Sequence, residues 1–275
     1  MKFIFGLINK LIILALIAMM ILGYSMFLEP NLLRVNKFEL GTLSSAKIRV
    51  VQFSDTHIGE YYSTKDLEKL VNIINLQNPD IIVFTGDIAD KIDETTDLDQ
   101  ISSVLSLLKA NKGKFAIFGN HDKGAQGHKY YKKAMEKGGF KVLVNDAVQY
   151  HLNEKVSVNI IGVDDALLGK PDYEKIKFLI KNRYYDILLI HEPDEVDNYI
   201  EEPYDLALAG HTHGGQVRLP FKGALKKAPL GEKYDKGMYD ISEEQKLYVS
   251  SGIGSTIMPF RFLNIPEIAV FDINL

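Results

Sequence analysis

The chain contains no cysteine. Without thiols it can form neither a disulfide nor a thiolate metal site, and it cannot use a cysteine nucleophile. Any metal that its side chains hold must therefore have nitrogen and oxygen ligands. The absence does not assign a compartment, because a cysteine-free protein suits either side of a membrane.

An excess of positive charge is also absent. The formal net charge is −4 at pH 7 and the isoelectric point is near 6.0, which argues against the basic surface that nucleic-acid binding requires. We therefore expect no nucleic-acid partner, and the sequence gives no sign of a protein partner. With 46% hydrophobic and 25% charged residues, the composition is that of an ordinary globular protein.

The N-terminus departs from this composition. Residues 11–28 carry no charge, and 18 helical residues cover about 27 Å, close to the thickness of a bilayer core. We predict a single-pass membrane anchor in residues 1–28. Because Lys2 and Lys10 precede the apolar run, the positive-inside rule favours an extracytoplasmic location for the rest of the chain. A cleaved signal peptide is the alternative, although the run is longer than the usual apolar region of such peptides.

The remaining sequence divides into a tether of mixed polarity at residues 29–47 and one domain at residues 48–275. Apolar runs typical of strands alternate with amphipathic helical patterns from residue 48 onward, and strands outnumber helices toward the C-terminus. This alternation predicts an α/β fold with two sheets packed together.

Five of the predicted strands end in clusters of polar residues. In α/β folds ligands bind at the carboxyl ends of the strands, so we expect these clusters to meet. Five of the seven histidines lie in them, which is hard to explain by histidines that merely fill a core. The clusters are Asp55 and His57; Asp87 and Asp90; Asn120, His121 and Asp122; His191; and His211 and His213.

Carboxylates and neutral imidazoles together suit manganese, iron or zinc rather than the oxygen-only sites of calcium and magnesium. In Asp55-x-His57 and His211-x-His213, the spacing of two places both side chains on one face of an extended strand end. Seven donors are more than one ion normally takes from protein, which favours two ions with Asp87 available as a bridge. The donors are Asp55, His57, Asp87, Asn120, His191, His211 and His213.

In order and spacing, the motifs Asp-x-His, Gly-Asp-x-x-Asp, Gly-Asn-His-Asp, a lone His and Gly-His-x-His resemble those of the calcineurin-like metallophosphoesterases. The resemblance covers residues 48–275. The stretches GHTHGGQVRLP and PFRFLNIPEIAV are similar to those of the membrane-associated bacterial branch of YaeI- and YkuE-type phosphodiesterases. The resemblance implies two packed mixed β-sheets flanked by helices.

It also implies roles for individual residues. Asp55, His57 and His213 resemble the ligands of one metal, Asn120, His191 and His211 those of the other, and Asp87 the bridge. His121 resembles a histidine that contacts the scissile phosphate and protonates the leaving oxygen, and Asp90 the carboxylate that orients it.

These roles predict a phosphoesterase that uses two divalent ions (Mn, Fe or Zn) and a metal-bridging hydroxide. The expected substrate is a phosphodiester or pyrophosphate, lipid-linked or part of the cell envelope. The alternatives are a membrane-tethered envelope-binding protein with a structural metal site, and a phosphomonoesterase or protein phosphatase.

Three further features have two interpretations each. Arg261 either binds a substrate phosphate or is a surface arginine, and Asp164 either lines the pocket or caps a turn. The segment at residues 220–236 is either a plain surface loop or faces the substrate.

Overall fold

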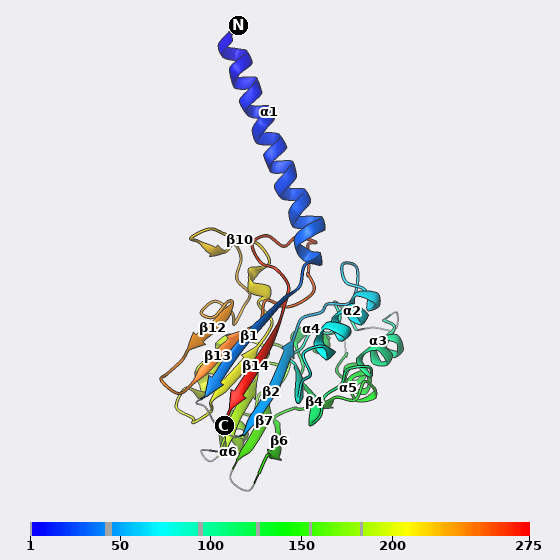
Figure 1. The fold of residues 1–275 in the computed structure, drawn as a ribbon, viewed down its shortest axis with the longest axis vertical. Helices are drawn as coiled ribbons and strands as arrows, with labels where there is room; N and C mark the ends of the chain where they lie inside the picture. The colour runs from blue at the N-terminus through cyan, green and yellow to red at the C-terminus, as the bar shows by residue number, and fades with distance from the viewer. Residues whose placement is uncertain (1, 42–45, 93–95, 125–126, 154–155, 182–183) are drawn as a thin grey trace.

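The computed structural model describes residues 2–41, 46–92, 96–124, 127–153, 156–181 and 184–275. Residues 42–45 of the predicted tether lie outside this part of the chain. Two six-stranded mixed sheets pack face to face (Figure 1). The order in the first is β1-β14-β2-β3-β4-β5, with β1 at Arg34–Gly41, β14 at Glu267–Asn274, β2 at Lys47–Phe53, β3 at Ile81–Phe84, β4 at Gly113–Ala116 and β5 at Lys141–Val142.

The second sheet has the order β12-β13-β9-β8-β7-β6. Its strands are β12 at Gly237–Asp240, β13 at Lys246–Val249, β9 at Leu206–Ala209, β8 at Tyr185–Leu189, β7 at Ser157–Gly162 and β6 at Asp146–His151. A small hairpin pairs β10 (Arg218–Leu219) with β11 (Gly223–Ala224). The central strands are almost continuously apolar because both of their faces are buried. Side chains such as Val50, Val83, Ile187 and Leu208 fill the space between the sheets.

Helices cover the outer faces of the two sheets. On the first sheet these are α2 (Thr64–Asn75), α3 (Leu98–Leu105) and α5 (His128–Lys137), and on the second α6 (Tyr173–Leu179) and a 3₁₀ segment, η4 (Pro193–Tyr199). The buried face of α2 recurs at helical spacing, and its N-terminus is closed by a capping box between Ser63 and Asp66. These features confirm the predicted sandwich of sheets flanked by helices.

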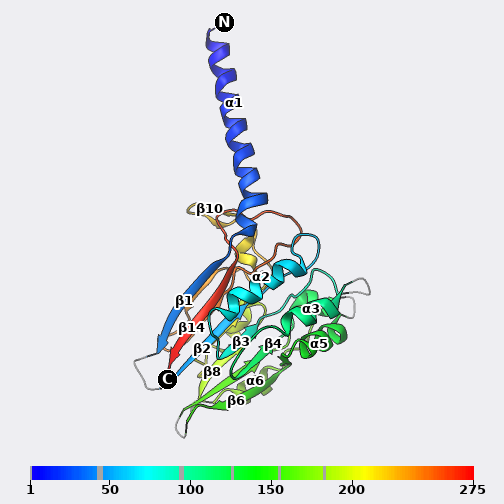
Figure 2. The ribbon, with the colours of Figure 1, turned by 45° about the vertical axis from the view of Figure 1, so that its right-hand side comes forward.

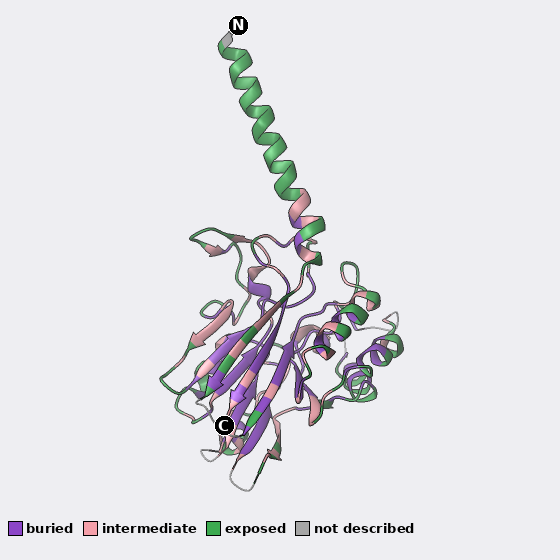
Figure 3. Ribbon diagram, viewed as in Figure 1, coloured by how far each residue is buried: buried purple, intermediate pink, exposed green. Residues whose placement is uncertain are grey.

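Helix α1 (Lys2–Gly23) projects away from the domain (Figures 1 and 2). It continues through a π-helical turn, η1 (Tyr24–Leu28), and a 3₁₀ turn, η2 (Glu29–Asn31). By length and composition the apolar stretch Phe3–Asn31 could cross a membrane. Nearly all of α1 is exposed (Figure 3), so it packs on nothing within the described chain.

Part of the predicted tether is not a tether. Residues 34–41 form β1, an edge strand whose register with β14 begins at Arg34↔Glu267. The mixed polarity of this segment comes from an edge strand with one buried face: Phe38 stacks on Phe271, while Glu39 lies on the other side. Because only η1, η2 and two further residues separate this strand from α1, the strand fixes the end of the helix to one edge of the sandwich.

The same register places residues 24–32, which we call the foot of α1, beside the carboxyl end of β2. Gln52, at the end of β2, pairs with Ala269, two residues after the Glu267 that pairs with Arg34 at the start of β1. Strands β3 and β4 run parallel to β2, so they end at the same edge. The predicted ligand clusters follow these ends and those of β8 and β9.

Candidate metal centre

The loops that carry the predicted ligands have an unusual backbone. Asp55, His57, Asp87, His211 and His213 all have left-handed conformations, with φ of +54°, +42°, +62°, +69° and +49°. The expectation that Asp55 and His57 extend from a straight strand is wrong, because β2 ends at Phe53 and the chain turns sharply after it. Each such residue costs of order 1–3 kcal/mol and typically persists at functional sites. These strained turns bring the five side chains into neighbouring groups of potential metal ligands.

One donor group joins the two sheets. Atoms of Asp55, His57 and His213 lie within 4.8 Å of one another, and all three side chains are buried. The Nε2 atoms of His57 and His213 are 3.0 Å apart, and His213 Nε2 is 3.7 Å from Asp55 Oδ1. Three donor atoms therefore face a single small volume.

A second donor group lies beside the first. It contains Asp87, His191 and His211 within the same 4.8 Å limit, and Asn120 Oδ1 is 3.0 Å from His211 Nδ1. Asp87 Oδ2 lies 3.3 Å from His191 Nε2 and 3.5 Å from His57 Nε2. One carboxylate oxygen thus stands between the two groups.

Glycine permits this close approach at two points. A Cβ on Gly119 would lie 2.2 Å from Asp87 Oδ1, and one on Gly210 would lie 2.5 Å from Asp55 Oδ2. Any side chain at either position would displace a predicted ligand.

Hydrogen bonds orient three of the imidazoles in a way that suits metal binding. One ring nitrogen of each faces an acceptor: His57 Nδ1 the Asp90 carboxylate at 2.9 Å, His191 Nδ1 the Thr85 carbonyl at 2.6 Å, and His211 Nε2 the Pro229 carbonyl at 2.9 Å. In the neutral ring the other nitrogen then carries a lone pair that points into the site. His191 Nε2 is buried and lies 3.3 Å from Asp87 Oδ2.

Before metal binds, the imidazoles of the site differ in charge. Burial alone would lower the pKa of His57 and His191, but the hydrogen bond from His57 to Asp90 and the charge of Asp87 beside His191 raise both pKa values above the usual range. Burial, followed by the nearby charge of His191, lowers the pKa of His211 to about 4. Burial alone would raise the pKa of Asp87, but His191 and His57 hold that pKa well below its usual range. Neutral imidazole and ionised carboxylate are the forms that bind metal, so an ion bound here would displace protons from His57 and His191. The residues present therefore fit divalent cations with nitrogen and oxygen ligands.

His121 and Asp90 lie against the first donor group. Both share a 4.8 Å cluster with His57, but His121 Nδ1 contacts the main-chain carbonyl of Asp90, at 2.8 Å. The Asp90 carboxylate contacts His57 instead. Asp90 therefore meets His121 through its backbone, because its side chain already holds a ligand.

Asp122 is a structural member of the site whose role the sequence did not reveal. It is fully buried and accepts N–H bonds from Asp87 at 2.7 Å, Ile88 at 3.0 Å and Gly119 at 2.9 Å. Burial raises its pKa to about 8, helped by the charge of Asp87 and opposed by these bonds. Asp122 thus connects the loop after β3 to the loop after β4. Its position in the Gly-Asn-His-Asp motif is the sequence feature that could have indicated this role.

Neither predicted substrate-binding residue reaches the site as expected. Arg261 is fully buried, and its guanidinium donates to the carbonyls of Ser251, Gly254 and Asn264. Its contact with the site is through the ring nitrogen of His213 that does not face the donor group: Nη2 is 3.4 Å from His213 Nδ1. The interpretation as a surface arginine is wrong, because the side chain is fully buried, and the guanidinium is bonded to backbone carbonyls rather than directed into the pocket.

Asp164 caps a turn, as one of its two interpretations held. Its carboxylate accepts from the backbone of Asp165 and Lys170 and pairs with Lys123 at 2.6 Å. These contacts use both of its oxygens, and it does not line the pocket over the donor groups.

A pocket of about 290 Å³ lies over the donor groups. Its floor includes His57, Asp87 and His211, and its walls include Lys226 and Lys227 from the predicted loop at 220–236. That segment therefore borders the pocket and places Lys226 and Lys227 in its lining, with Lys227 Nζ donating to the Glu232 carbonyl at 2.5 Å.

Comparison with known proteins fits this geometry. Residues 48–215 match the model of the calcineurin-like phosphoesterases. The chain belongs to this family. It is 39% identical over 259 residues to the metallophosphoesterase YkuE of Bacillus subtilis, covering 92% of this chain and 89% of YkuE. It is 27% identical over 257 residues to the phosphodiesterase YaeI of Escherichia coli, covering 91% and 92% of the two chains.

The calcineurin-like fold is also found among solved structures. The crystal structure of TT1561 from Thermus thermophilus aligns with a TM-score of 0.50 at 12% identity, covering 76% of this chain and 91% of that one. At this identity the likeness shows the fold alone. As a calcineurin-like phosphoesterase, the chain is a hydrolase of a family that uses divalent metals, and the predicted resemblance is confirmed.

Proposed function

We propose that this phosphoesterase hydrolyses a phosphodiester or pyrophosphate with two divalent ions, and that its substrate is a lipid-linked or envelope phosphate. The observation that carries the proposal is the position of Asp87 Oδ2 between two donor groups, 3.5 Å from His57 Nε2 and 3.3 Å from His191 Nε2. We assign Asp55, His57 and His213 to one ion, Asn120, His191 and His211 to the other, and Asp87 to both. Ions bound there would neutralise phosphoryl charge and activate water.

The protein side chains have separate tasks in this proposal. The Asp90 carboxylate and the Thr85 carbonyl orient His57 and His191 so that a lone pair of each faces the centre. His121 sits at the pocket wall, with Nδ1 held by the Asp90 carbonyl, and Nε2 is the atom we assign to donate a proton to the leaving oxygen. Lys226 and Lys227 attract and orient the anionic substrate.

Two features favour a membrane-linked substrate. The donor groups lie at the edge of the sandwich from which α1 leaves. The foot of α1 is also bonded to the site: Glu29 is fully buried and accepts from the backbone of Leu263 and Asn264, while Asn264 Nδ2 donates to the His213 carbonyl at 2.5 Å. The helix is thus part of the scaffold of the centre.

We also propose that α1 spans the cell membrane with the domain on its outer face, as the charges of Lys2 and Lys10 favour. Reporter enzymes fused to the C-terminus test this topology. A reporter that is active only outside the cytoplasm should show activity. Signal only from a cytoplasmic reporter would overturn it.

Hydrolysis of bis-p-nitrophenyl phosphate tests the activity. The purified chain, stripped with a chelator, should be inactive, and Mn, Fe or Zn should restore turnover. Parallel assay of p-nitrophenyl phosphate measures the preference between diester and monoester. No turnover of either compound with any of these metals would reject the proposal and favour a binding protein.

A further inference from the structure

An apolar rim of exposed side chains lies on η1, on the β10–β11 hairpin and on the segment around residue 262, which hydrogen bonds connect. We define it as Phe27, Phe221, Ile257, Met258 and Leu263, all of them exposed. Phe221 is fully exposed at the tip of the β10–β11 hairpin, and Ile257 is 78% exposed. Soluble surfaces seldom gather large apolar side chains in this way without a partner.

The backbone of the rim is strained. Phe221, Ile257 and Leu263 have φ of +64°, +66° and +54°. The left-handed region is unfavourable for bulky residues and is a true outlier for the β-branched Ile257. All three side chains are nevertheless exposed in this conformation.

The rim is continuous with α1. Arg218 N donates to the Phe262 carbonyl, Arg261 N donates to the Ser25 carbonyl, and Tyr24 packs edge-on against Phe262. Hydrogen bonds thus join the hairpin, the segment around residue 262 and the foot of the helix into one surface.

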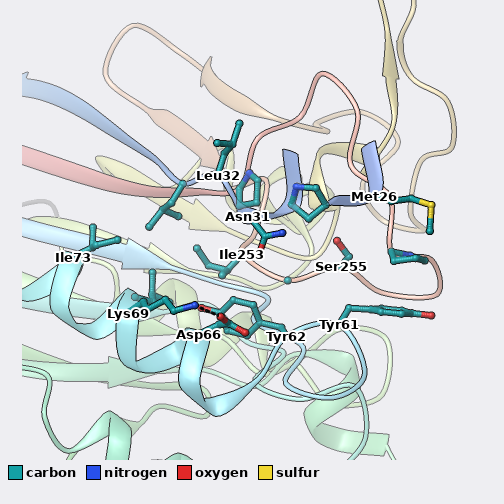
Figure 4. A pocket seen from close by; sticks show the side chains of 16 residues that line it. Met26, Asn31, Leu32, Tyr61, Tyr62, Asp66, Lys69, Ile73, Ile253 and Ser255 are labelled. Atoms are coloured by element: carbon teal, nitrogen blue, oxygen red, sulfur yellow. Dashed lines mark hydrogen bonds and ion pairs between the residues drawn. The ribbon is translucent and has the colours of Figure 1, made fainter. Parts of the chain in front are cut away.

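A second pocket, of about 280 Å³, extends this surface to the other side of the helix foot (Figure 4). Met26 and Leu32 of the foot face Tyr61 and Ile253 of the domain across it. The lining is mixed, because Asp66 and Lys69 border the same pocket.

The charge near the rim suits a lipid surface. Residues 217–230 contain no Asp or Glu, while Lys222, Lys226 and Lys227 are exposed. The segment is therefore positively charged, whereas the chain as a whole has a net charge of −4. Lysines beside apolar tips are typical of surfaces that dock on anionic headgroups.

We propose that the apolar rim docks into the bilayer interface that α1 enters, so that the pocket opens in the headgroup layer. Ile257, Lys226 and Lys227 belong both to this face and to the pocket wall. A lipid-borne phosphate could then reach the donor groups without leaving the membrane. This step rests on the proposed lipid-linked substrate, whereas the docking itself does not.

Tryptophan fluorescence provides a direct test, because the chain has no tryptophan of its own. Full-length Phe221→Trp and Met258→Trp variants would be reconstituted in phosphatidylcholine–phosphatidylglycerol vesicles with plain or brominated acyl chains. The control is Phe178→Trp on α6, where the native side chain is 74% exposed and is distant from α1 (Figure 2). Bromine quenches only an indole that enters the bilayer.

We expect brominated lipid to reduce the emission of the Phe221→Trp and Met258→Trp variants and to leave that of Phe178→Trp unchanged. Equal emission of the first two variants in plain and brominated vesicles would overturn the docking surface. Because quenching does not depend on turnover, a failed hydrolysis assay would count against the proposed function alone.

Discussion

The two sheets supply unlike halves of the candidate centre. The loops of the first sheet bring the carboxylates Asp55 and Asp87, and these loops are tied together: Asp55 N donates to the Gly86 carbonyl at 2.9 Å, and Asp122 clamps the loop after β3. The second sheet brings imidazoles, His191, His211 and His213, and is followed by the segment that borders the pocket. The first half therefore supplies both carboxylates, together with His57 and Asn120, on loops that are bonded to one another, while the second supplies three imidazoles and the segment that borders the pocket.

The largest effect is expected where the halves meet. Asp87→Ala removes the oxygen that lies between His57 and His191. We expect loss of bound metal and of measurable turnover, because like-charged metal ions need a shared anion. Metal content and bis-p-nitrophenyl phosphate hydrolysis measure both. Wild-type metal content in this variant would show that Asp87 does not join the halves.

A large effect confined to turnover is expected at His121, which belongs to the first half but is not a proposed ligand. His121→Ala should reduce hydrolysis of a poorly activated phosphodiester about 10²- to 10⁴-fold while metal content stays the same. An ester with a p-nitrophenolate leaving group should lose less, because it needs less protonation. Equal losses on both esters would argue against proton donation.

A smaller effect is expected on the pH dependence of stability, through His211 in the second half. The pKa of His211 is lowered from 6.5 to about 4 in the folded chain, so the unfolded state binds a proton first as the pH falls. The contribution of His211 to the free energy of unfolding is therefore complete above about pH 6.5 and is lost toward pH 4.

Urea unfolding of the metal-free chain between these pH values measures the slope. We expect a loss of about 1–3 kcal/mol from this group, and a His211→Asn variant should show a shallower pH dependence. Identical slopes for both proteins would mean that His211 is not held neutral by burial.

The smallest effect on catalysis is expected at Asp164, outside both halves. Asp164→Ala breaks its contacts with Lys123 and the backbone of Lys170 and should destabilise the fold by about 1–3 kcal/mol. The KM and kcat for bis-p-nitrophenyl phosphate should stay near their wild-type values. A rise in KM without loss of stability would indicate that Asp164 contacts the substrate instead.

Much of this arrangement could be predicted because strand ends and polar clusters coincide in the sequence. Donors after five strands meet in the structure, since the parallel strands of each sheet end at one edge. The left-handed turns at Asp55 and His57 were not predicted, because spacing alone assumes an extended backbone.

The partners that a side chain or segment contacts were harder to predict than the strand end at which it lies. Nothing in the motif around Arg261 reveals that three carbonyls take its charge, and nothing in the run of residues 34–41 distinguishes a tether from an edge strand. Both depend on partners distant in sequence. Lys226 and Lys227 likewise gain their place at the pocket from the path of a long segment rather than from a motif.

The most direct test of the central claim is the metal content of the purified full-length chain after loading with Mn, Fe or Zn and removal of free ions. Seven donors in two groups around Asp87 predict two tightly held ions per chain. One ion or none per chain would contradict the account.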